Sequence, residues 1–328
     1  MRKTVSDQHQ ERLTQARDEA DRIEGPVPLV SIIIAVYNDW MQLDGCLQSL
    51  AQQTHAPSFE VIVVDDGGSA PPESIDRWAN HYSFTLIRHP HAGISATRNR
   101  GIKSARGTVL LFVDADCRLR PDCLAALASA VEASPRQNSF QLRLVGDCSG
   151  MVGRAETLRL ATLQDQLLQP DGCIRYLDTA GAAIRRAKVN MERGLFDVRA
   201  PRGEDTLLLS ELIQDGELPF FVAGAIVQHA VSLPLSQYLL KAVRGAYVEG
   251  RSFDIIASKG ITIRATHRKR LSMLVAMWKL SQDCSTGRSA WFVVAVRQTL
   301  CRITSYLYRL ARSISNPRLR TPLHPAAP

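Results

Sequence analysis

The stretch TVLLFVDADCRLRPD, residues 108–122, decides the fold class of this 328-residue chain. Its apolar run from Thr108 to Val113 is typical of a strand buried on both faces. Two carboxylates, Asp114 and Asp116, follow this run directly. In an extended chain residues i and i+2 project to the same side, so both can approach one hard cation. The stretch therefore predicts Mn²⁺ or Mg²⁺ bound between a strand end and substrate phosphates.

The sequence before this stretch alternates between strands and helices. Apolar runs at 29–36, 59–64 and 84–88 predict strands, and the patterns near 43–53 and 95–105 predict helices. This alternation is typical of a doubly wound α/β sheet, in which ligands bind beyond the carboxyl ends of the strands.

The sequence after this stretch is less regular. A helix is expected to about Ala133 and a strand at 218–227, and the pattern from Leu233 onward is mostly helical.

Two further acidic pairs lie where strand ends or loops are expected. Asp65-Asp66 follows the second strand, and Glu204-Asp205 follows Gly203. Taken alone, an acidic pair after a strand can merely cap the next helix. Three acidic motifs in one doubly wound chain favour a shared ligand instead, because strand ends gather at one edge of the sheet.

Five motifs, in this order, resemble family 2 glycosyltransferases. They are VSIIIAVYN (30–38), VIVVDDGG (61–68), GISATRNRGI (93–102), LLFVDADCRLRPD (110–122) and GED (203–205). The resemblance implies a GT-A fold with a doubly wound mixed sheet. It also implies a hexosyltransferase that moves sugar, with inversion, from a UDP-, GDP- or dTDP-linked donor to an acceptor hydroxyl, with Mn²⁺ or Mg²⁺ as cofactor.

The resemblance also implies roles for individual residues. Those implied at the donor are Ala35, Tyr37 and Asp66 around the base, Asp114 at the ribose or sugar, Arg98 at phosphate or sugar oxygens, and Asp116 as the metal ligand. Asp205 resembles the catalytic base, with Glu204 beside it to hold an acceptor hydroxyl. His229, after the last strand, is a candidate further metal ligand, and an ordinary loop histidine is the alternative.

The chain departs from the family pattern at two places. Most relatives read DDGS or DDCS, whereas this chain has Gly68 before Ser69. Residues 194–198 read GLFDV rather than GGFDE. The second departure leaves the identity of the acceptor open.

Charge is unevenly distributed along the chain. Residues 231–328 hold 16 Lys and Arg against three Asp and Glu, whereas the first 230 residues hold 24 against 29. We expect a polar N-terminal helix and linker at 1–26, a catalytic domain at 27–230 and a basic helical extension at 231–328, with a disordered tail after Asn316. The basic extension predicts an anionic partner.

A membrane surface is the anionic partner that the extension favours. Apolar residues from Val293 to Ile314 recur at spacings of three and four, with arginines beside them, as in a basic amphipathic helix. Docking of this stripe on the catalytic domain is the alternative. Nucleic acid is not favoured, because clustered aromatics are missing among the charges. We expect no leader peptide, and no apolar run reaches the roughly 20 residues of a membrane-spanning helix. The expected location is therefore cytoplasmic and peripheral, on the inner face of the cell membrane. There the enzyme would act on a hydroxyl acceptor that can be lipid-linked, in the synthesis of cell-envelope polysaccharide or glycolipid.

Two other functions fit part of the sequence. A strand followed by Asp-x-Asp is also the nucleophile signature of haloacid dehalogenase phosphatases, with Asp114 as nucleophile and Asp116 as acid and base. That motif usually follows the first strand, whereas here it follows the fourth. A catalytically silent nucleotide-sugar-binding scaffold is the second alternative.

Overall fold

The computed structural model describes residues 27–200, 202–230, 233–259, 267–283 and 287–315. The helix predicted in the first 26 residues and the disordered tail predicted after Asn316 lie outside these residues, so both stay predictions.

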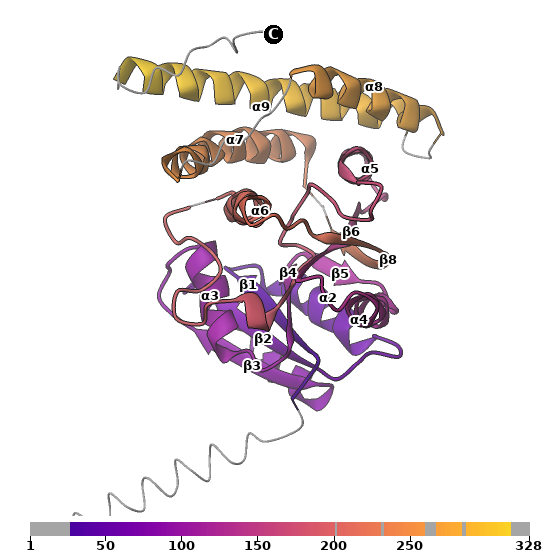
Figure 1. Cartoon of the computed structure of the whole chain (residues 1–328), viewed down its shortest axis with the longest axis vertical. Helices are drawn as coiled ribbons and strands as arrows, with labels where there is room; N and C mark the ends of the chain where they lie inside the picture. Colours follow the sequence, from indigo (N-terminus) through magenta and orange to yellow (C-terminus); the bar gives the residue numbers. More distant parts are fainter. Residues whose placement is uncertain (1–26, 201, 231–232, 260–266, 284–286, 316–328) are drawn as a thin grey trace, which may run out of the picture.

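A single mixed sheet forms the body of the molecule (Figure 1). Its strand order is β3-β2-β1-β4-β7-β6-β8-β5. The strands are β1 (Val30–Val36), β2 (Phe59–Asp65), β3 (Ser83–Arg88), β4 (Val109–Asp114), β5 (Cys117–Leu119), β6 (Ser139–Gly146), β7 (Ala182–Arg185) and β8 (Phe220–His229). β3, β2, β1 and β4 pair in parallel, whereas β7 is antiparallel to β4 and β6, and β5 is antiparallel to β8. The predicted mixed α/β sheet is therefore confirmed.

The parallel half is covered on both faces because successive side chains of a strand point to opposite sides. In β1, Ile32 and Ile34 pack in one apolar cluster, and Ile33 packs in another. The first cluster includes residues of α2 (Trp40–Ala51) and α4 (Cys123–Ala133), and the second includes residues of α3 (Ile94–Ser104). This alternation explains the continuous β-branched run of β1, which is buried from both sides.

A layer of helices lies beyond the antiparallel half of the sheet (Figure 1). Its members are α5 (Met151–Leu167), α7 (Leu235–Ser258), α8 (His267–Asp283) and α9 (Gly287–Ser315), whereas Leu208 of α6 (Glu204–Gln214) packs in the second cluster, with β1, β4 and α3. A third apolar cluster joins α5, α7, α8 and α9. The helical C-terminal part predicted from the sequence is therefore present. The short helices η1 (Glu73–Asn80) and η2 (Arg186–Lys188) complete the described elements.

The last helix, α9, has two different halves. Near its start Ala290, Val293 and Val294 are buried in the third cluster. Further along, Ile303, Leu307, Leu310 and Ile314 are between 43% and 73% exposed. The stripe predicted from the sequence thus docks at one end and faces solvent at the other. Within the described ranges, none of the helices combines the length and the apolar character that crossing a membrane requires.

Candidate active site

The acidic motifs meet because parallel strands end at one edge of the sheet. In the register of β1, Val36 is paired with Asp65 of β2 and Ala35 with Asp114 of β4. Tyr37 follows β1 at the same edge, is half exposed, and has its ring 4.8 Å from the His91 ring. The expected edge therefore brings together the predicted donor-binding residues of β1, β2 and β4.

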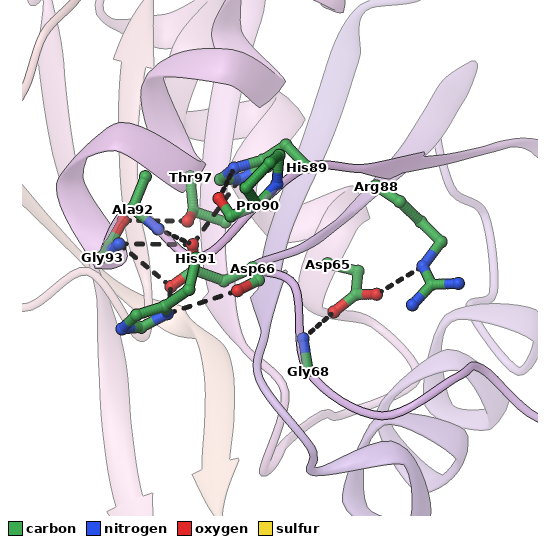
Figure 2. A network of polar contacts seen from close by, with 10 residues as sticks. All are labelled: Asp65, Asp66, Gly68, Arg88, His89, Pro90, His91, Ala92, Gly93 and Thr97. Carbon is green, nitrogen blue, oxygen red and sulfur yellow. Dashed lines mark hydrogen bonds and ion pairs between the residues drawn. The ribbon is translucent and has the colours of Figure 1, made fainter.

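The Asp65-Asp66 turn is held by the protein itself (Figure 2). The fully buried carboxylate of Asp65 accepts hydrogen bonds from Arg88 Nε at 2.7 Å and from the Gly68 N–H at 3.3 Å. Gly67 has a positive φ of 78°, and a Cβ there would lie 2.6 Å from the His91 nitrogen. Only glycine fits this turn without strain.

Asp66 fixes the loop that leads into α3 (Figure 2). Its Oδ1 accepts the Ala92 N–H at 2.8 Å, its Oδ2 accepts the Gly93 N–H at 3.1 Å, and His91 Nδ1 lies 2.8 Å from Oδ2. Gly93 is the N-cap of α3 and has a φ of 89°. Both oxygens thus have partners inside the protein, and base recognition by Asp66 stays a prediction.

The Asp114-Ala115-Asp116 motif ends in a carboxylate that faces a histidine. β5 is antiparallel to β8 and pairs Cys117 with His229, so the neighbouring Asp116 lies with its Oδ2 3.3 Å from His229 Nε2. Ligand atoms of Asp116, Cys117 and His229 all lie within 4.8 Å of one another. The sequence proposed Asp116 and His229 as metal ligands, and the fold places them side by side although 113 positions separate them.

The chemistry of this cluster suits a divalent cation. Burial raises the pKa of the Asp116 carboxyl, and Asp114 adds to that effect, while His229 and Lys241 act in the opposite direction. A desolvated carboxylate gains most from a nearby positive charge. His229 Nδ1 is buried without a hydrogen-bond partner in the described structure. Burial also raises the pKa of Cys117 well above its usual range, so its thiol stays protonated and is a poor ligand for a hard cation.

Arg98 joins the DxD motif to the acidic pair at the start of α6. Its guanidinium donates to Asp114 Oδ1 at 2.7 Å and to Glu204 Oε1, and its side chain is only 3% exposed. Burial acts to lower the pKa of Arg98, but Asp114 and Glu204 raise it above the usual value. Arg98 was predicted to contact the donor directly. In the structure its hydrogen bonds join the two motifs, and the donor contact stays a prediction.

Asp205 is the candidate catalytic base. It lies in the first turn of α6, and its Oδ1 accepts the Thr206 N–H at 2.6 Å. Among the described residues, nothing donates a hydrogen bond to its Oδ2. Burial, together with the nearby charges of Asp178 and Glu204, raises the pKa of Asp205 to about 8. A carboxylate with a pKa close to neutrality is suited to accept a proton from a hydroxyl.

Two charged residues near the site were not predicted from the sequence. Asp178 precedes β7, accepts the Tyr176 hydroxyl at 2.8 Å, and acts on the pKa of Asp205. Lys241 lies on α7 and acts on the pKa of Asp116. Neither has a local motif, because both approach the site only through the packing of β7 and α7.

The mixed sheet, whose parallel half ends in carboxylates, is that of the GT-A fold. A solved structure of this fold is similar to the chain. The mannosyltransferase PcManGT from Pyrobaculum calidifontis, in complex with GDP-Man and Mn²⁺, aligns with a TM-score of 0.53 and 17% identity, over 92% of this chain and 87% of that chain. At this identity the similarity supports the fold alone.

The sequence comparisons give the family. The profile described as Glycosyl transferase family 2 matches residues 31–192. The pre-mycofactocin glycosyltransferase of Mycobacterium tuberculosis is 27% identical over 295 residues, which cover 86% of this chain and 60% of that protein. EpsH of Bacillus subtilis is 38% identical over 97 residues, or 29% of this chain and 28% of EpsH. These matches support the assignment of the chain to glycosyltransferase family 2.

These curated relatives are matched over less than two thirds of their own length. The similarity therefore covers the catalytic motifs more completely than it covers the relatives as whole proteins.

Proposed function

We propose that this chain is a hexosyltransferase. It would transfer a hexose from a nucleoside diphosphate donor to an acceptor hydroxyl, with inversion at the anomeric carbon. The observation that carries the proposal is the pair of bonds made by Arg98. Because one guanidinium holds Asp114 and Glu204, the DxD motif and the acidic pair of α6 belong to a single site. This link supports a donor at Asp116 and a base at Asp205 as parts of one transfer site.

The residues of this site divide the chemistry between them. Mn²⁺ or Mg²⁺, held by Asp116 and His229, would neutralise the charge that develops on the departing nucleoside diphosphate. Asp205 would accept the proton of the acceptor hydroxyl at its Oδ2, which has no donor in the described structure. Asp66 and Tyr37 would border the base, and Ala35 leaves room beside them. A single base facing the leaving group supports in-line attack and inversion.

The test is a panel of UDP-, GDP- and dTDP-sugars with the full chain, with and without Mn²⁺. A ligand that binds only the folded state stabilises it by about 2.7 kcal/mol at a concentration of 100 Kd. We expect metal-dependent thermal stabilisation by one class of nucleotide, and slow release of the nucleoside diphosphate. NMR of the product reports the anomeric configuration.

The same panel separates the alternatives. Stabilisation with no nucleotide release, in the presence of a broad set of hydroxyl acceptors, would support a silent nucleotide-sugar-binding scaffold. A covalent phosphoryl group on Asp114 would support the haloacid dehalogenase alternative, in which Asp205 has no role.

The exposed half of α9 supports an acceptor at an anionic membrane surface. Ile303, Leu307 and Leu310 are largely exposed there, and Arg302 and Arg309 are exposed beside them. Apolar side chains can enter the headgroup region while arginines contact anionic lipid, each contributing about 1 kcal/mol. We therefore propose peripheral attachment to the inner face of the cell membrane, with the enzyme acting in the synthesis of a polysaccharide or glycolipid.

Co-sedimentation with vesicles of phosphatidylglycerol and phosphatidylcholine tests this attachment. A variant with Leu307→Gln and Leu310→Gln should lose binding, whereas Met41→Gln, which removes an 85% exposed apolar side chain elsewhere, should not. Binding by the wild type should fall at high salt. Equal sedimentation of all three proteins would contradict the proposal.

A further inference from the structure

A pocket of about 420 Å³ lies between α7 and the segment that precedes the acidic pair of α6. Its walls include Arg202, which is three residues before Asp205, and Leu233, which is four residues after His229. Two lining residues are thus close in sequence to the candidate base and to the candidate metal ligand His229. Its volume is within the range of small-molecule sites.

The wall formed by α7 is one face of that helix. Gln237, Lys241, Arg244 and Val248 line the pocket and recur at spacings of three and four, so they lie on one side of the helix. The opposite side, which includes the buried Tyr238 and Ala242, packs in the helical layer. The basic side chains are thus directed away from the packed face, toward the pocket.

The charge of the pocket has one sign. Arg202, Lys241 and Arg244 are among the lining residues, and the lining contains no aspartate or glutamate. In the described part of the chain, Lys241 and Arg244 have no carboxylate within ion-pair distance. Apolar contacts come from Leu233, Leu240 and Val248. Three cations around an apolar floor can bind an anionic group that is attached to a less polar molecule.

A glycine in α7 allows the Arg202 guanidinium to lie against the helix backbone. Arg202 lies against Gly245, where an added Cβ would be 3.2 Å from the guanidinium carbon and the Nε atom. A larger residue at position 245 would have to push Arg202 aside. Glycine in the middle of a helix is less stable than alanine, so the close approach of Arg202 gives Gly245 a specific use.

We propose that this pocket binds a phosphate group at the edge of the transfer site. Planar guanidinium groups suit phosphate oxygens, and a lysine adds a point charge. Binding of phosphate by the pocket does not depend on the proposed function. Only the identity of the molecule that carries the phosphate rests on it. The acceptor is one source, because the pocket adjoins the segment that holds Asp205. The diphosphate of the donor is the other source, because Leu233 of the pocket lies four residues after the candidate metal ligand His229.

The experiment uses the full chain and inorganic phosphate, titrated by ³¹P NMR without metal or donor. The Lys241→Gln, Arg244→Gln double variant should bind phosphate at least about tenfold more weakly, since one charge-assisted hydrogen bond is worth that factor or more. The matched control is Arg100→Gln, Arg136→Gln, which removes two exposed charges outside the pocket. Equal weakening in the two double variants would overturn the proposal.

A second titration identifies the source of the phosphate. Saturating UDP with Mg²⁺ displaces inorganic phosphate if the pocket holds the donor's diphosphate, and the double variant then also loses affinity for UDP. Phosphate that still binds to the UDP-saturated protein belongs to a phosphorylated acceptor. Because phosphate binding is measured without turnover, a failure of sugar transfer would not be confused with a failure of this site.

Discussion

β2 and β4 lie on either side of β1 and both end in a carboxylate, yet the two strand ends differ in how their carboxylates are used. Asp65, at the end of β2, is completely buried and accepts hydrogen bonds from Arg88 and Gly68. Asp116, just beyond β4, is partly exposed, and its neighbours are His229 and the Cys117 thiol. The carboxylate at the end of β2 has both oxygens hydrogen-bonded within the protein, whereas the carboxylate beyond β4 can still bind a ligand.

This difference separates stability from chemistry at one edge of a sheet. A buried carboxylate with full hydrogen bonding stabilises the turn that it closes. A carboxylate whose charge is only partly compensated has a raised pKa and is available to a cation or a proton. Asp205 resembles Asp116 in this respect, and Asp66 resembles Asp65.

Asp205→Asn should have the largest effect on turnover. An amide cannot accept the proton of the acceptor, and a general base typically contributes about 10² to 10⁴-fold. Donor binding and the thermal midpoint should stay close to wild type. Steady-state transfer rates and UDP titration check this. Retention of near-wild-type rates would move the base to another residue, with Glu204 next.

Asp116→Ala should remove metal-dependent donor binding. Mutation of a residue that only supports a metal ligand typically costs about 10 to 100-fold in metal affinity. Loss of a carboxylate that binds the metal directly should therefore weaken Mn²⁺-dependent UDP or GDP binding by at least about tenfold. Binding measured by calorimetry in EDTA should be the same for both proteins. If the variant kept its response to Mn²⁺, the metal site would have to lie elsewhere.

Asp65→Asn should act on stability instead. Replacing a fully buried, hydrogen-bonded carboxylate should lower the free energy of unfolding by about 1 to 3 kcal/mol. Asp44→Asn is the control, because its pair with Arg77 is about half exposed and should be worth at most about 1 kcal/mol. Urea denaturation measures both. An unstable Asp116→Ala and a stable Asp65→Asn would reverse the comparison between the two strand ends.

The pH profile gives the smallest effect. Because the base must be ionised and burial raises the pKa of Asp205 to about 8, the rate should rise with pH through that value and then level off. Asp178→Asn removes a negative neighbour and so lowers the pKa of Asp205. Its profile should be displaced toward lower pH with little loss of the maximum rate. An unchanged profile would show that another group limits the rate.

The parallel half of the sheet could be predicted from the sequence because its strands are buried on both faces. β1, β2 and β4 consist almost entirely of apolar residues, and turn signals follow them. The acidic motifs at their ends were predicted for the same reason, since parallel strands end at one edge. The GT-A fold and the family were correctly inferred from these motifs.

β6 and α5 were not predicted because buried polar residues obscure their patterns. Gln141 of β6 is fully buried and donates to the backbone oxygen of Gly181. In α5, Glu156 pairs with Arg159 and accepts the Tyr238 hydroxyl, and both α5 residues are largely buried. A periodicity search treats such residues as exposed. Only the tertiary partners, which come from distant segments, identify them as core.

The site was predicted where a motif is local and missed where packing supplies the residue. Asp116 and Asp205 occur in recognisable motifs. The nearness of His229 to Asp116 depends on the antiparallel pairing of β5 with β8. Lys241 and Asp178 depend on how α7 and the segment before β7 fold back, which no short pattern encodes. The roles of the individual site residues remain predictions for the variants above.

The double attachment of Arg98 has a consequence for how each substrate changes the affinity for the other. Under the proposed roles, a donor that engages Asp114 would compete with Arg98 for that carboxylate. Displacement of Arg98 would then alter its bond to Glu204, the residue proposed to hold the acceptor. The affinities for the two substrates are then thermodynamically coupled, and the coupling factor is the same whichever substrate binds first. Couplings of this kind are typically about 5 to 150-fold. Arg98→Lys, which cannot hold two carboxylates in the same way, should bring that factor close to one while each substrate still binds alone.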